Sequence, residues 1–170
     1  IQFEFYNSRD LKHLESLIKD NTSAIYLESP GTYTFEIIDI QKVLKICKKY
    51  NLKTLIDNTW ATALYFNPLE FGVDIVIEAI TKYISGHSDI MMGAVVGNAD
   101  NFIQLERWTK NTGSYVSPDD VYLSLRGLRT LPLRLRQSSD NSLAIAQFLE
   151  NKDEVKKVIH PALPQHPDHK

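Results

Sequence analysis

The stretch from Asp74 to Lys82, with the sequence DIVIEAITK, carries the strongest signal for the fold. Its first half is a short run of β-branched apolar residues, which is typical of a buried strand. Its second half ends in Thr81 and Lys82, and a lysine at this point is uncommon because lysine side chains normally lie at the surface. The stretch therefore predicts a strand over 74–77 that delivers a lysine to one end of a sheet.

Similar patterns on both sides of this stretch predict an α/β fold. Further apolar runs indicate strands over 24–27, 53–56 and 92–96. Apolar residues at helical spacing predict helices over 10–19, 37–50, 101–110 and 119–151, the last with a kink at Pro132. Strands separated by helices favour a mostly parallel sheet flanked by helices, and the final helix is long.

The composition narrows the classes of function. The chain has 170 residues, with 19 Lys+Arg against 21 Asp+Glu, so it lacks the basic surface expected for nucleic-acid binding. No apolar run is long enough to cross a membrane, and no secretion leader is recognisable, which favours the cytoplasm. Cys47 is the single cysteine and the histidines lack ligand spacing, so we expect no metal site. Both ends look like cuts in a longer protein, so we expect an internal piece.

Polar residues follow three of the predicted strands, where ligands bind in open α/β sheets. Glu28, Asp57 and the pair Thr81–Lys82 come directly after these strands. A lysine amine surrounded by apolar residues becomes a nucleophile that forms an imine with an aldehyde. The alternative is a surface lysine paired with an acid, and Asp57 alone can equally cap the following turn.

A basic cluster lies on the predicted long helix. It consists of arginines interleaved with leucines, namely Arg126, Arg129, Arg134 and Arg136. This pattern favours an amphipathic helix at a domain or subunit contact over a nucleic-acid patch.

Residues 74–88 resemble the signature around the cofactor lysine of the Cys/Met-metabolism enzymes that depend on pyridoxal 5′-phosphate (PLP). The segments 28–31, 57–60 and 124–131 resemble the same family in the expected order. The resemblance implies the fold of the aspartate-aminotransferase-like large domain (fold type I). It places part of the PLP-binding domain at 1–116, a helical connection at 117–151 and the start of a small domain at 152–170.

The resemblance also implies roles for individual residues. Lys82 would hold PLP covalently and later carry protons, and Asp57 would pair with the pyridine nitrogen, which improves the ring as an electron sink. Thr81 would donate to the phosphate, Ala79 would offer only its backbone N–H there, and Thr59 would lie near the ring.

Within the family, Gly31, Trp60 and Ala79 resemble the cystathionine β-lyase branch. That branch implies β-elimination of cystathionine, an amino-acid thioether, to homocysteine, pyruvate and ammonia, as in transsulfuration and methionine biosynthesis. The alternatives are a γ-type relative, such as a γ-synthase or γ-lyase, and a non-catalytic remnant. Family members are dimer-based homotetramers, and they carry a phosphate loop, a ring-stacking tyrosine and a carboxylate-binding arginine that find no match in this chain.

Overall fold

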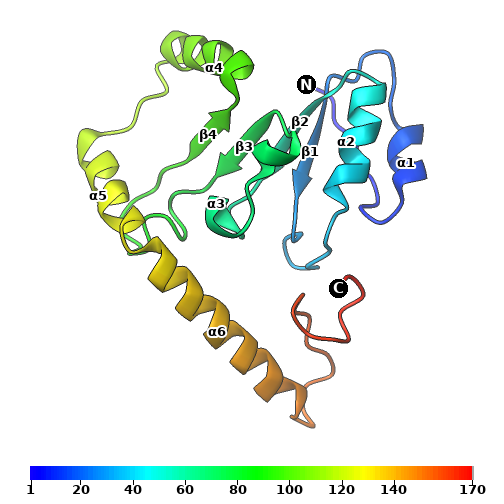
Figure 1. Ribbon diagram of the computed structural model, residues 1–170, viewed down its shortest axis with the longest axis vertical. Coiled ribbons are helices and arrows are strands. Elements are labelled where there is room, and N and C mark those ends of the chain that lie inside the picture. Colours follow the sequence, from blue (N-terminus) through cyan, green and yellow to red (C-terminus); the bar gives the residue numbers. More distant parts are fainter. Residues whose placement is uncertain (170) are drawn as a thin grey trace.

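The computed structural model describes residues 1–169, and its centre is a four-stranded sheet (Figure 1). The strands are β1 (Ala24–Glu28), β2 (Lys53–Asp57), β3 (Ile75–Glu78) and β4 (Ala94–Gly97), and they lie in that order. The first three are parallel, which confirms the mostly parallel sheet. β4 pairs antiparallel with β3, because residues 79–93 return to the sheet without a crossover helix.

Helices connect and flank the strands. They are α1 (Leu11–Ser16), α2 (Ile40–Lys49), α3 (Thr62–Tyr65), a 3₁₀ helix η1 (Pro68–Phe71), α4 (Ala99–Thr112), α5 (Pro118–Leu128) and α6 (Leu131–Glu150). The prediction of one kinked helix over 119–151 was wrong, because the chain forms two helices there. Pro132 lies in the first turn of α6, where a helix has no use for the missing N–H.

The hydrophobic core lies between α1, α2 and one face of the sheet. Alternate residues of β1 and β2 point into it, and Leu27 and Ile56 are almost fully buried. The apolar face of α2 packs on them through Val43 and Cys47, as its spacing predicts. This packing fixes the sheet on which the site is built.

Asp74 ties the starts of β2 and β3 together. Its carboxylate accepts hydrogen bonds from the backbone N and the Oγ1 of Thr54, at 2.9 and 3.0 Å, and pairs with Lys53 at 3.0 Å. Partial burial acts to raise the pKa of Asp74, but the hydrogen bonds from Thr54 and the ion pair with Lys53 together outweigh it, so this pKa is lowered. Since register is set at this end, the opposite ends of the two strands also lie level.

Helix α6 runs away from the sheet, and the segment that follows it turns back (Figure 1). Near the end of this segment, Asp168 accepts hydrogen bonds from Arg9 at 2.9 Å and from the backbone N of Ile37 at 3.1 Å. The predicted domain limits at 116/117 and 151/152 stay predictions.

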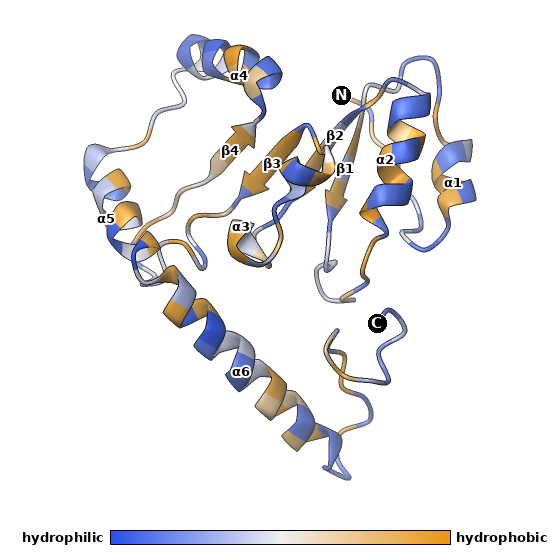
Figure 2. Cartoon of the chain, viewed as in Figure 1, coloured by the Kyte–Doolittle hydropathy of each residue, from blue (hydrophilic) through white to orange (hydrophobic). Residues whose placement is uncertain are grey.

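Hydropathy is unevenly distributed over the elements (Figure 2). The strands are mostly apolar. Helices α4 to α6 carry large apolar side chains that are exposed, among them Phe102, Trp108, Tyr122, Leu133 and Phe148. Within residues 1–169, no helix combines the length and the apolar character that crossing a membrane requires.

Candidate active site

The carboxyl ends of β1, β2 and β3 open onto one pocket of about 1040 Å³. Glu28 and Asp57 are neighbours in register at the ends of the parallel strands β1 and β2. Asp57 is in turn paired with Ile77 on β3. The pocket is lined by Glu28, Thr32, Asp57, Thr59, Trp60, Ala79, Thr81, Lys82, Tyr83, Gly86, Ser88, Ile90, Met91, Arg134, Gln137 and Ser138. All five site residues predicted from the sequence are therefore brought together at this pocket.

Asp57 is held by the loop that follows β2. The backbone N of Thr59 donates to Oδ1 of Asp57 at 2.9 Å, and the Thr59 Oγ1 accepts from the backbone N of Ala79 at 2.8 Å. The second oxygen of Asp57 accepts no hydrogen bond from any residue in the described range 1–169. It is free to accept one from a group in the pocket.

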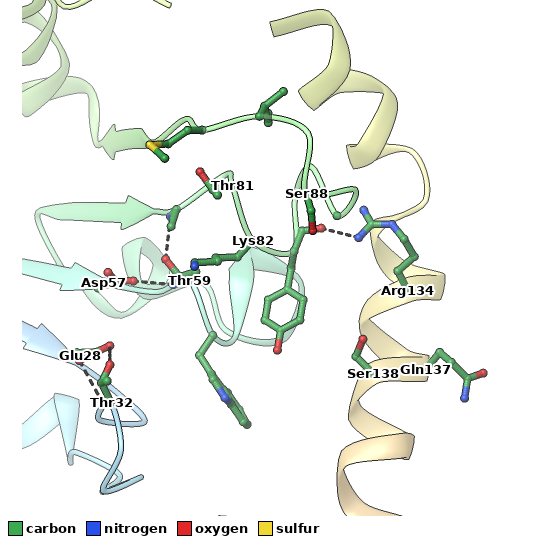
Figure 3. Close-up of a pocket in the computed structure, with 16 residues that line it drawn as sticks. Glu28, Thr32, Asp57, Thr59, Thr81, Lys82, Ser88, Arg134, Gln137 and Ser138 are labelled. Atoms are coloured by element: carbon green, nitrogen blue, oxygen red, sulfur yellow. Dashed lines mark hydrogen bonds between the residues drawn. The ribbon is translucent and has the colours of Figure 1, made fainter. Parts of the chain in front are cut away.

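Lys82 lies on a tight turn after β3. Its backbone N donates to Ala79 O, and its carbonyl accepts from Gly86 N, both at 2.9 Å. Figure 3 shows its side chain extending toward Thr59 and Asp57. The Nζ atom forms no ion pair or hydrogen bond within residues 1–169, so no contact within these residues has to break before the amine meets a ligand. Lys82 is exposed, so the expectation that apolar surroundings bury this amine is wrong for the chain as described.

Thr81 and Ala79 already use the groups that the resemblance assigns to a phosphate. The Thr81 hydroxyl donates to Met92 O at 3.1 Å and accepts from Met92 N at 2.8 Å. The Ala79 N–H donates to Thr59. The Thr81 hydroxyl would have to leave Met92 O to donate to a phosphate, and the Ala79 N–H would have to leave Thr59.

Glu78 is a buried acid that sequence reasoning missed. Glu78 is not among the residues that line the pocket, is 6% exposed, and accepts a hydrogen bond from the Asn58 Nδ2 at 3.2 Å. Burial raises the pKa of Glu78 to about 7; the Asn58 hydrogen bond lowers it, and the charge of Asp57 raises it. The signal in the sequence was a glutamate inside an apolar strand, because such an acid faces either the core or an edge.

Helix α6 contributes residues to the pocket that sequence reasoning also missed. Arg134, Gln137 and Ser138 lie one helical turn apart and line the side of the pocket opposite Asp57 (Figure 3). The leucine–arginine pattern predicted Arg134 in a domain or subunit contact. Only the tertiary fold brings it to the tight turn that carries Lys82, called the lysine turn below. Residues 1–169 contain no group of three His, Cys, Asp or Glu side chains arranged to hold a metal ion.

A free primary amine and a carboxylate share this pocket, and these are the two groups that an aldehyde cofactor with a basic ring nitrogen requires. The donor set fits PLP: Lys82 matches the aldehyde, the free oxygen of Asp57 matches the ring nitrogen, and the pocket has room for both. The model of the Cys/Met metabolism PLP-dependent enzyme family matches residues 1–170. The chain belongs to this family, and its cofactor is PLP.

Individual relatives carry different names. The chain is 44% identical over 156 residues to an L-alanine/L-glutamate racemase of Wolbachia pipientis, covering 92% of this chain and 39% of that protein. It is 43% identical over 169 residues to a putative cystathionine β-lyase of Rhizobium johnstonii, covering 99% of this chain and 43% of the relative.

A solved structure confirms the fold. Cystathionine γ-lyase from Lactobacillus plantarum, complexed with L-serine, superimposes with a TM-score of 0.92 at 35% identity. The match covers 98% of this chain and 44% of that structure. The chain thus spans about two fifths of the length of these relatives, and their different names leave the reaction type within the family open.

Proposed function

We propose that the protein is a carbon–sulfur lyase that cleaves cystathionine by β-elimination and, with uptake of water, gives homocysteine, pyruvate and ammonia. The observation that carries this proposal is the convergence of the free Lys82 amine and the Asp57 carboxylate on one pocket in a chain of this family. The proposed substrate is an amino-acid thioether.

Each residue has a defined task in the proposed reaction. When bound, PLP supplies an electron sink for the negative charge that develops at Cα of the substrate. Lys82 Nζ takes the Cα proton and returns a proton to the departing sulfur. Asp57 holds a proton on the ring nitrogen, and Thr59 keeps Asp57 oriented through its backbone N–H. Thr81 is proposed to donate to the phosphate.

Three residues favour the β-type reaction. Gly31, Trp60 and Ala79 match the β-lyase branch, and the relative from Rhizobium johnstonii is named a putative cystathionine β-lyase. A γ-type reaction is the first alternative, because the cystathionine γ-lyase from Lactobacillus plantarum superimposes on nearly the whole chain. A homotetramer built from dimers is part of the proposal, by resemblance to the family.

Racemisation is a second candidate, because the relative from Wolbachia pipientis is named an L-alanine/L-glutamate racemase. Racemisation begins with the same removal of the Cα proton by a lysine. It differs because a proton is delivered to the opposite face of Cα, which inverts that centre, and no bond at Cβ breaks. The residues described above serve the first step of either reaction.

The test uses the protein as its gene encodes it, with PLP, and supplies either L-cystathionine or L-alanine. We expect pyruvate as the dominant keto acid from cystathionine. Dominant 2-oxobutyrate would contradict β-elimination, and D-alanine formed without any keto acid from cystathionine would favour the racemase.

Two variants separate catalysis from a non-catalytic remnant. Lys82→Ala should abolish keto-acid release, whereas Lys45→Ala, on the exposed face of α2, should retain it. Equal activity of the Lys82→Ala variant and the wild type would contradict the proposed catalytic role of Lys82.

A further inference from the structure

Arg134 makes an unusual set of contacts for an arginine beside a pocket. Its Nη1 donates to Tyr83 O at 2.7 Å, and its Nη2 donates to Ile84 O at 3.2 Å and to Gly127 O at 2.7 Å. Its Nε donates to the Thr130 hydroxyl at 3.0 Å. All of these acceptors are neutral, and no carboxylate in residues 1–169 forms an ion pair with Arg134. Its guanidinium therefore holds backbone carbonyls rather than an opposite charge.

Two of those carbonyls belong to the turn that carries Lys82. The turn closes through the hydrogen bond from Gly86 N to Lys82 O at 2.9 Å and that from Ser85 N to Ile80 O at 2.9 Å. The carbonyls of Tyr83 and Ile84 point outward from it, and Arg134 binds both. Figure 3 shows the guanidinium reaching from α6 toward this turn, beside Ser88.

Two glycines make this close approach possible. A Cβ on Gly86, which has a φ of +70°, would lie 1.9 Å from the Arg134 Nη1. A Cβ on Gly127 would lie 2.2 Å from Ser85 O, so α5 packs directly on the backbone of the turn. The turn is thus fixed on this side by α5 and α6, and on the other side by the hydrogen bonds between Thr81 and Met92.

We propose that Arg134 is a positioning residue, which sets the place of the Lys82 amine in the pocket by holding the carbonyls of residues 83 and 84. This proposal rests on the proposed role of Lys82 toward PLP. A planar fork with several donors suits the task because one side chain fixes carbonyls from two elements at once. Proton transfer by Lys82 demands such precision, since small displacements of a reacting group cost rate steeply.

The variants are Arg134→Met, Arg134→Lys and the matched control Arg136→Met, which removes an exposed arginine from the same helix. All are made in the protein as its gene encodes it. The measurements are kcat and KM, the pH midpoint of the visible absorbance of the PLP-loaded protein, and hydrogen exchange of residues 80–88 against residues 53–57.

We expect Arg134→Met to lower kcat at least about tenfold, with a much smaller change in KM. It should also shift the pH midpoint of the absorbance and speed exchange selectively in residues 80–88. Arg134→Lys should recover part of these effects, because an ammonium group reaches fewer of the acceptors. Arg136→Met should behave as the wild type. If Arg134→Met does not fold, the same comparison is made with Arg134→Lys.

The proposal is overturned if the Arg134 variants only melt at a lower temperature while kcat, the pH midpoint and exchange of residues 80–88 stay at wild-type values. Failure of the proposed function is a distinct result, in which the wild type itself releases no keto acid and carries no PLP on Lys82. Hydrogen exchange then still decides whether Arg134 holds the turn: selective acceleration in residues 80–88 supports that role, and its absence overturns it.

Discussion

At the residue scale, the two acids on neighbouring strands differ in the role that their surroundings permit. Asp57 keeps one oxygen free toward the pocket and is oriented through the other by the Thr59 N–H. Glu78 does not line this pocket, and its side chain is buried. The first is placed to bind a ligand in the pocket, and the second has a raised pKa, so it is neutral at mildly acidic pH.

Asp57→Asn should lower the rate of keto-acid release by about a hundredfold or more. The amide keeps an oxygen for the Thr59 N–H but loses the charge that would hold a proton on the ring nitrogen. The control is Glu28→Gln, which removes the neighbouring carboxylate in register with Asp57 and should cost far less. If Glu28→Gln lost more activity than Asp57→Asn, Glu28 rather than Asp57 would be the acid that pairs with the ring nitrogen.

Glu78→Gln should change how stability depends on pH. The pKa of Glu78 rises from an ordinary value of 4.5 to about 7 in the folded chain, so the folded state binds more protons in this interval. The free energy of unfolding therefore falls as pH increases from about 4.5 to about 7. The variant stays neutral and lacks this loss, so it should be the more stable protein at pH 8.

Urea unfolding of the Glu78→Gln variant and the wild type at pH 5 and pH 8 measures this difference. One pKa unit corresponds to about 1.4 kcal/mol, so the gap at pH 8 amounts to a few kcal/mol at most. A gap that is the same at both pH values would show that Glu78 is ionised throughout.

At the scale of elements, α2 and the sheet form the rigid support of the site. Val43→Ala removes two buried methyl groups from the contact between them and should cost about 2 kcal/mol of unfolding free energy. Lys45→Ala, on the exposed face of α2, should change stability little. Chemical denaturation of both variants checks the pair, and equal losses would mean that α2 does not pack as described.

Local sequence patterns predicted the elements that are determined by their own residues rather than by tertiary packing. The spacing of apolar residues predicted α2, and the apolar runs predicted β1 to β3. The resemblance around Lys82 predicted which residues belong to the site. The direction of β4 was not predictable, since an apolar run reads the same in a parallel or an antiparallel strand. The contact of Arg134 with the turn that carries Lys82 was not predictable either, because it depends on how α5 and α6 pack on that turn.

At the scale of the whole molecule, the chain covers about two fifths of its relatives' length and exposes large apolar side chains on α4, α5 and α6. Its Thr81 hydroxyl and Ala79 N–H, both proposed phosphate ligands, are engaged within the chain. We therefore expect the 170-residue chain alone to bind PLP more weakly than the protein as its gene encodes it. Equilibrium dialysis of both checks this, and equal affinity would mean that residues 1–170 supply the whole cofactor site.

We propose that the amine of Lys82 is the group that binds the cofactor covalently. Borohydride reduction of the PLP-loaded protein, followed by peptide mapping, tests it most directly, because reduction makes the bond between lysine and PLP permanent. We expect one pyridoxyl-modified peptide, carrying the group on Lys82, that is retained in Lys45→Ala and lost in Lys82→Ala. A modification on another lysine, or none at all, would contradict it.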